Sequence, residues 1–275
     1  MSAVQSSRPR NELAPFVRAY AQRTVSLTDR PWTESVPAQL EQIVNFEFGV
    51  LPEIRHRDGD VSNPILVGGA QTTFSGTLHL RPGVESFAIF FWPCGWSQLF
   101  NIPPKEITNQ FCDATLVQGS TIRTLWNRLG ETSIFARRVE IIEEFLLSKV
   151  FDSTPEGTIS RAANYLFHRC GDLKIPVLGR QGAFSLRQFQ RVFLRDVGMP
   201  AKVFARIARF EAAVDAKLAN PARTWLDIAH SFGYYDQMHM VHDFRDLGRN
   251  TPTQVLVEMG DVRPPALVSS ENAVD

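Results

Sequence analysis

The sequence has few cysteines, no long hydrophobic run and no excess of charge of either sign. Its 275 residues include only Cys94, Cys112 and Cys170, a scattered set without a CxxC pair, which indicates a reducing compartment rather than a disulfide framework. The longest apolar run, around residues 87–93, is far shorter than the ~20 residues that a membrane-spanning helix needs. We therefore expect a soluble protein with no membrane partner. Residues 1–10 lack the apolar centre of a secretory signal, which favours a cytoplasmic location.

Glycine and proline are also unremarkable in number, at 17 each, so the composition excludes collagen-like and low-complexity proteins. Hydrophobic residues make up 44% and charged residues 21%, close to the averages of globular proteins. At roughly 100 to 200 residues per domain, the length favours two domains.

The balanced net charge hides an uneven distribution along the chain. Between Cys170 and Leu256 there are 12 Lys and Arg but only 8 Asp and Glu, whereas the rest of the chain is slightly acidic. A solvated helical face produces such a modest excess as readily as a nucleic-acid surface does. The positions of these charges must therefore decide between the two.

The N-terminal half contains short extended segments at 44–50, 64–70, 74–80 and 86–92, separated by glycine and proline turns. This pattern predicts a small β-rich barrel or sandwich. Helical spacing of apolar residues between 121 and 150 then predicts two helices.

Polar residues 152–157, with a proline and a glycine, separate this part from a helical region. We predict an α+β protein made of a β-rich domain with trailing helices (1–152), an all-helical domain (153–258) and a disordered tail (259–275). The helical domain is expected to contain one helix closed by Gly171 and a longer helix from Ala201 to Leu218.

Residues 227–245 predict two short helices joined by a turn. Gly233 stands where the chain must leave the first helix with positive φ, and Asp236 caps the second. Met240 and Phe244 are expected to face the core at positions i and i+4. Two short helices joined in this way form a helix-turn-helix, whose second helix enters the major groove of DNA. The outer face of that helix carries Gln237, Met238, Val241, His242 and Arg245.

A similar unit precedes it, with Ser185 as the N-cap. Its predicted buried stripe is formed by Leu186, Phe189, Val192 and Phe193. Its outer face carries Arg187, Gln188, Gln190, Arg191 and Arg195. Arg pairs with guanine and Gln with adenine through two hydrogen bonds each, so these side chains suit base recognition. An ordinary amphipathic helix also has a polar outer face.

Residues 158–256 resemble the DNA-binding domain of AraC/XylS-type transcriptional regulators, a bacterial family. The resemblance is carried by these motifs, in order: SLRQFQRVF (185–193), GMP (198–200), RIARFEA (206–212), DIA (227–229), FGY (232–234), DQMH (236–239) and TP (251–252). It implies two helix-turn-helix units joined by a long helix, with the two recognition helices about one turn of DNA apart, ~34 Å.

The resemblance also assigns base-facing positions. They are Arg187, Gln190 and Arg191 in the first unit and Gln237, Met238, Val241 and His242 in the second. His242 stands where the family usually has Arg, and Met238 and Val241 make no polar base contacts, so specificity here would rest on Gln237, thymine methyl groups or DNA shape. Gly179 and Gly182 weaken the leading helix of the first unit.

The resemblance implies double-stranded DNA as the partner, and RNA polymerase as well if the protein is an activator. The N-terminal domain would bind a small effector, form a homodimer, or both. The dense aromatic residues Phe90, Phe91, Trp92, Trp96 and Phe100 could line a ligand pocket or form plain core.

We expect no enzyme activity, no catalytic residues and no cofactor. His239 and His242 lie three residues apart on one helix but have no accompanying zinc-ligand spacing, so we expect no metal site. The alternative interpretation is a β-barrel ligand-binding protein or an enzyme, with the helices serving as a protein-interaction module.

Overall fold

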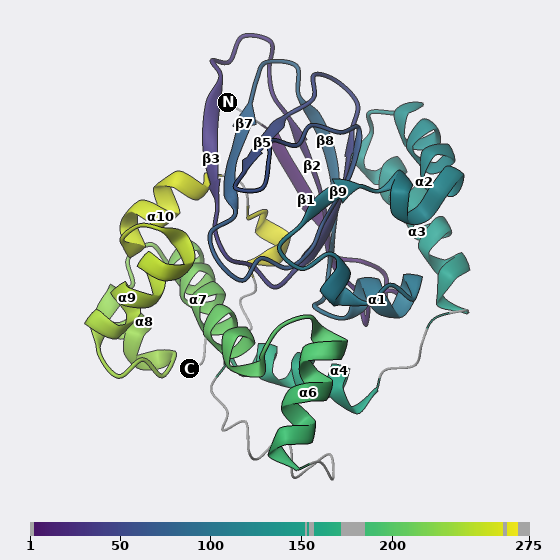
Figure 1. Cartoon of the computed structure of the whole chain (residues 1–275). Coiled ribbons are helices and arrows are strands. Elements are labelled where there is room, and N and C mark those ends of the chain that lie inside the picture. Colours follow the sequence, from purple (N-terminus) through teal and green to yellow (C-terminus); the bar gives the residue numbers. More distant parts are fainter. Residues whose placement is uncertain (1–2, 152, 154–156, 172–184, 261–262, 269–275) are drawn as a thin grey trace.

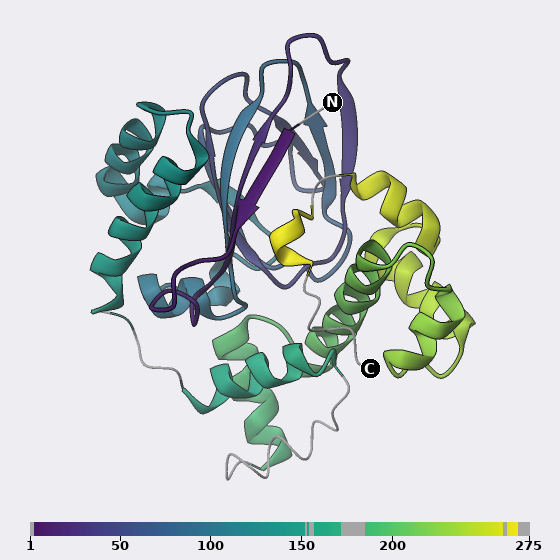
Figure 2. The same cartoon turned by 180° about the vertical axis from the view of Figure 1, so that it is seen from behind.

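The fold is described from a computed structural model, which covers residues 3–151, 153, 157–171, 185–260 and 263–268. Among these residues, no helix has the length and apolar character needed to cross a bilayer. The N-terminal half forms two antiparallel sheets, and the C-terminal half is helical (Figures 1 and 2). The predicted α+β fold is confirmed, and the β-rich part is a pair of sheets rather than a closed barrel in the part that is described.

The larger sheet has the strand order β1-β2-β8-β4-β6-β9. Its strands are β1 (Ala3–Ser7), β2 (Val17–Thr24), β8 (Glu85–Phe91), β4 (Gln42–Glu47), β6 (Ile65–Gly68) and β9 (Phe111–Asp113). The smaller sheet has the order β3-β7-β5, with β3 (Trp32–Val36), β7 (Gly76–Leu80) and β5 (Glu53–His56). The four strands predicted from sequence correspond to β4, β6, β7 and β8.

Successive side chains of each strand point to opposite sides, so the larger sheet has two different faces. One face, with Phe46, Phe87 and Ile89, packs on helices α1 (Gly95–Phe100), α2 (Thr115–Gly130) and α3 (Phe135–Val150). The opposite face, with Ala88 and Phe90, looks toward the smaller sheet. Of the aromatic residues singled out in the sequence, Phe91, Trp96 and Phe100 pack with the helical side of the sheet, as plain core would.

The C-terminal half contains six described α-helices. They are α4 (Thr158–His168), α6 (Leu186–Val197), α7 (Ala201–Ala219), α8 (Trp225–Ser231), α9 (Gln237–Gly248) and α10 (Pro252–Met259). Helix α7 is the long helix expected from Ala201, and Gly171 has the positive φ of 72° expected after α4. Figures 1 and 2 place α6 at one end of α7, and α8 and α9 beside α7.

The two halves share one apolar core. Leu40, Ala70 and Cys94 of the β-rich half lie in the same buried cluster as the side chains of α4, α6, α7, α8 and α9. The backbone N–H of Ala38 donates to the carbonyl of Leu247 in α9, 2.9 Å away. The N–H of Leu40 donates to Glu211 Oε1 in α7, 2.8 Å away. The connection between β3 and β4 is therefore fastened to the helical half at two points.

The C-terminal segment differs from its sequence-based prediction. Residues 259–275 are predicted to be disordered, but 263–268 form an ordered segment that includes the short 3-10 helix η2 (Pro265–Leu267). Leu267 is buried against Ala19, Ala21, Ala88 and Phe90 of the larger sheet, and η2 lies against the back of that sheet in Figure 2. Residues 269–275 lie outside the described part of the chain.

Candidate nucleic-acid interface

The start of α9 is fixed by local chemistry that the sequence predicts. Gly233 has φ 68° in the turn after α8, and the Asp236 carboxylate accepts a hydrogen bond from the N–H of His239 at 2.7 Å. Such caps satisfy the free N–H groups of the first helical turn. The ring of His239 accepts a bond from the N–H of Tyr235 through Nδ1, at 3.3 Å, and so also belongs to this turn.

Helix α9 has one buried face and one exposed face. Met240, Phe244 and Leu247 are buried, and Phe244 packs against Phe210 of α7 with ring centroids 4.7 Å apart. The predicted base-facing residues lie on the other side: Gln237, Met238, His242 and Arg245 are exposed and Val241 is half-buried. The structure therefore brings the five predicted residues of the second unit onto one open surface.

Helix α6 repeats this arrangement with a different cap. The Ser185 hydroxyl accepts from the N–H of Gln188, and the Gln188 side chain accepts from the N–H of Ser185, which completes a capping box. Gln188 is thus engaged in the cap. Phe189 and Phe193 are buried, while Arg187, Gln190 and Arg191 are exposed at positions i, i+3 and i+4 of one face.

One detail of α6 differs from the predictions, and one contact was not predicted. Leu186, predicted to be buried, is 46% exposed because it is the first residue of the helix and lies beyond the core formed by Phe189 and Phe193. Arg195 is exposed as predicted, but its guanidinium forms an ion pair with Asp196 at 2.6 Å. Both residues also line a groove against the β-rich half, at the end of α6 far from its cap.

Helix α7 holds the two units in a fixed relation. Arg206 of α7 binds Asp243 at 2.7 Å and Asp246 at 2.8 Å, both in α9. Two residues before Arg206, near the same N-terminal end of α7, Phe204 packs edge-on against Phe193 of α6, with centroids 5.6 Å apart. The segment with Gly179 and Gly182, predicted to be the weakened leading helix of the first unit, lies outside the described residues.

A buried cluster of charges links the two halves and is not evident from the sequence. Arg263 binds Asp215 of α7 at 2.9 Å, and Arg18 of β2 binds Glu41 and lies 3.5 Å from Asp215. Although burial opposes it, Arg263 and Arg18 lower the pKa of Glu41 to about 2. Burial and the Glu41 carboxylate raise the pKa of Glu211 well above its usual range. The sequence contained one sign of buried charges: Glu211 and Asp215 are spaced i, i+4 within an otherwise apolar helical stripe.

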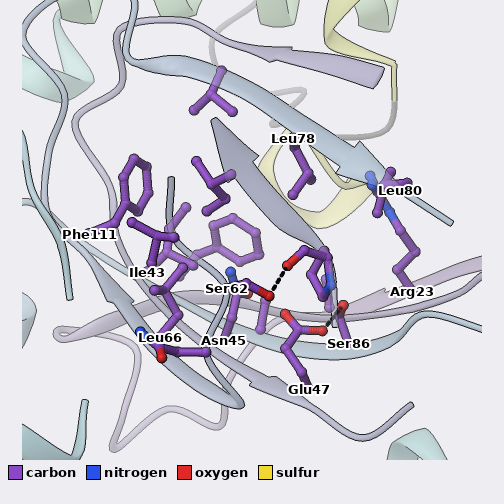
Figure 3. Close-up of a pocket in the computed structure, with 18 of the residues that line it drawn as sticks. Arg23, Ile43, Asn45, Glu47, Ser62, Leu66, Leu78, Leu80, Ser86 and Phe111 are labelled. Atoms are coloured by element: carbon purple, nitrogen blue, oxygen red, sulfur yellow. Dashed lines mark hydrogen bonds between the residues drawn. The ribbon is translucent and has the colours of Figure 1, made fainter. Parts of the chain in front are cut away.

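A second feature missed from the sequence is a cavity of about 940 Å³, part of it open to solvent, between the two sheets. Its walls come from all nine described strands, from loop residues between them and from Pro264 of the C-terminal segment (Figure 3). Of the aromatic residues considered as pocket walls, only Phe90 lines it; Phe111 was not considered. The sequence of β4 contained a sign of this cavity, because side chains alternate between the two faces of a strand and the polar Asn45 and Glu47 therefore share a face with Ile43.

No side-chain group in the described residues has the three or more His, Cys, Asp or Glu needed to hold a metal ion. The three cysteines form no disulfide within the described part of the chain; Cys94 and Cys170 are buried and Cys112 is half-buried.

Comparison with known proteins agrees with this arrangement of helices. A family described as "Helix-turn-helix domain" matches residues 178–257, which include α6 to α9. The C-terminal domain is an AraC-type helix-turn-helix domain. The resemblance to AraC/XylS-type regulators is thereby confirmed, and the chain is a DNA-binding transcriptional regulator of this type.

The N-terminal half matches another family, described as "Domain of unknown function (DUF6597)", over residues 5–113. No protein among the curated proteins matches the chain.

Solved structures of ToxT from Vibrio cholerae share the fold of both halves. ToxT of strain O395 matches with a TM-score of 0.50 and 8% identity, covering 94% of this chain and 97% of ToxT. Wild-type ToxT of strain SCE256 with unsaturated fatty acid bound matches with a TM-score of 0.52 and 8% identity, covering 94% and 95% of the two chains. At this identity the likeness concerns the fold.

Proposed function

We propose that this regulator reads a specific DNA sequence with α6 and α9, which enter adjacent major-groove segments, and that its N-terminal domain senses a small effector. The observation that carries the first part is the pair of capped helices that pack on α7, each with a buried aromatic face and an exposed polar face. In helix-turn-helix proteins, the N-terminal residues of the recognition helix contact base edges.

The proposed base contacts are Arg187, Gln190 and Arg191 of α6 and Gln237, Met238, Val241 and His242 of α9. Gln188 and Arg195 are expected to contribute less to base recognition, because Gln188 is used in the capping box and Arg195 is paired with Asp196. Arg245, in the last turn of α9, suits a phosphate contact better than a base contact, because base readout is concentrated at the start of the helix.

Substitution of Arg191 by Ala tests this proposal. We expect the variant to lose about 1 to 3 kcal/mol of binding free energy to the preferred duplex and to relax preference at one base position. The matched control is Arg123→Ala, which removes the same charge from an exposed position of helix α2 in the N-terminal domain. Uniform weakening on all duplexes would make Arg191 a phosphate contact, and unchanged binding would remove it from the interface.

The salt dependence of binding separates DNA recognition from the alternative interpretation, a protein-interaction module. For binding to duplex DNA, log K falls with log salt by about 0.9 for each phosphate neutralised. Duplex binding that is undetectable even at low salt would exclude the proposed function.

The effector role is supported by the cavity between the sheets and by its connections to α7. Gln39, from the β3–β4 connection that is bonded to α7 and α9, lines the cavity. Pro264 also lines it and follows Arg263, which binds Asp215 of α7. ToxT, which has the same fold, has been solved with unsaturated fatty acid bound. An occupant of the cavity therefore touches two segments that are fastened to the DNA-binding domain.

The proposal includes a cytoplasmic location, where duplex DNA is accessible, and the two family options of homodimerisation and contact with RNA polymerase. Duplex affinity measured with and without candidate small molecules tests the effector role. Sedimentation of the chain with and without its preferred duplex tests dimerisation.

A further inference from the structure

The cavity between the sheets is mostly apolar, and its charged side chains lie together at one end. Ile43, Leu66 and Phe111 form one end, while Arg23, Glu47 and Ser86 lie together at the other (Figure 3). The strand register explains this gathering, because Ser86 of β8 is paired with Arg23 of β2 on one side and with Glu47 of β4 on the other. A largely apolar pocket with a few converging polar groups is the usual form of a small-molecule site.

Among the residues that the structure describes, Arg23 and Glu47 are the only charged ones that line the cavity, and they differ in how their charges are compensated. Arg23 is paired with the buried carboxylate of Glu34 in β3, 2.8 Å away. Glu47 accepts a hydrogen bond from the Ser86 hydroxyl, but no ion pair to its carboxylate occurs within the described ranges of the chain. This end of the cavity therefore holds the Glu47 carboxyl group and a guanidinium that is already paired with Glu34 outside the cavity lining.

A buried carboxylate without a cation is costly, and it is stabilised when a positive charge is placed beside it. A ligand carboxylate would instead meet the Glu47 carboxyl group, and the Arg23 guanidinium beside it is already bound to Glu34. We propose that the cavity binds an apolar molecule carrying one protonated amine, with Glu47 as its counter-ion and Phe90, Phe111 and Leu66 around its apolar body. This inference rests on the proposed effector role and assigns a chemical class to the effector.

The protonation of Glu47 predicts how the affinity for an amine changes with pH. Burial raises the pKa of Glu47 to about 8, against the opposing effects of the Ser86 hydrogen bond and the positive charge of Arg23. The charged groups facing it on the cavity side are Arg23 of β2 and, through Arg23, Glu34 of β3; β8 and β6 contribute the uncharged Ser86 and Leu66. Below about pH 8 the Glu47 carboxyl group is protonated, so it must release its proton before it can pair with an ammonium group. Amine affinity should rise about tenfold per pH unit up to about pH 8 and then level off.

The test uses three ligands with a similar apolar body, namely 2-phenylethylamine, 2-phenylethanol and 3-phenylpropionate, titrated calorimetrically into the full-length protein at pH 8. Hexylamine and 2-(1-naphthyl)ethylamine extend the range of body size. The test variant is Glu47→Gln, which keeps the side-chain shape and removes the charge. The matched control is Glu53→Gln on β5, which removes a partly exposed carboxylate that pairs with Arg81 and does not line the cavity.

We expect at least one amine to bind, 2-phenylethylamine to bind about tenfold or more tightly than 2-phenylethanol, and 3-phenylpropionate to bind less tightly than the alcohol. In Glu47→Gln the amine and alcohol affinities should come within about threefold of each other, whereas Glu53→Gln should behave like the unmodified protein. The carboxylate binding more tightly than the amine, an unchanged amine preference in Glu47→Gln, or no binding of any amine would each overturn the proposal.

Duplex binding measured on the same preparations separates this inference from the proposed function. A protein that binds its preferred duplex but no amine retains the DNA-reading function and refutes the amine site. A protein that binds the amine with the expected pH profile but binds no duplex supports the site and refutes the regulator.

Discussion

Replacing Glu47 by Gln should stabilise the protein increasingly as the pH rises from 5 to 8. In the unfolded chain this carboxyl ionises near its ordinary pKa of about 4.3, but in the folded protein burial raises the pKa to about 8. Between these values the unfolded state releases the proton while the folded state keeps it, so folding loses about 1.4 kcal/mol per pH unit. The accumulated cost is about 4 kcal/mol at pH 7, and it is absent below the pKa of the unfolded chain.

Gln cannot ionise and has nearly the same shape, so the variant should escape this cost while still accepting the bond from Ser86. At about 2 °C per kcal/mol for a chain of this size, the melting temperature of Glu47→Gln should exceed that of the unmodified protein by about 8 °C at pH 7 and by little at pH 5. Differential scanning calorimetry across this range measures the effect, with Glu53→Gln as the control. A melting-temperature difference that stays constant with pH would refute the assigned burial and protonation of Glu47.

Further predictions concern the core and the domain junction. Phe244→Ala should lower the free energy of unfolding by about 3 to 5 kcal/mol, because the ring is fully buried between Phe210 and Trp225; an unchanged urea midpoint would refute its place in the core. Arg263→Ala leaves the carboxylates of Asp215 and Glu41 short of a cation and should cost about 3 to 5 kcal/mol. Hydrogen exchange should then quicken in α7 and in the β3–β4 connection, and unchanged exchange in both would show that the cluster does not hold the two halves together.

The helix-turn-helix elements could be predicted because their determinants are local. Asp236, Gly233 and the apolar spacing of Met240 and Phe244 all lie within one short stretch, so caps, turn and buried face follow from neighbouring residues. The outward positions on α6 and α9 follow from the same periodicity.

The features missed depend on residues far apart in sequence. Strand β1 is polar and lies at the edge of its sheet, so it has little hydrophobic pattern. In β2, the polar residues Arg18 and Gln22 are buried because distant groups, Glu41 and Arg138 among them, satisfy them. The cavity likewise arises only when strands from the whole N-terminal half assemble into two sheets, and the Arg263 cluster only when the C-terminal segment folds back on the larger sheet.

The most direct test of DNA reading by α6 and α9 together is selection of binding sites from a random duplex library, with the unmodified protein, Arg191→Ala, Gln237→Ala and the control Arg123→Ala. If the two helices enter successive major-groove segments, the first two variants each lose preference at a different base position, and the two positions lie about 10 base pairs apart. The control should select the same sequences as the unmodified protein. Failure to enrich any sequence, or loss of preference at the same position in both variants, would contradict the proposed reading.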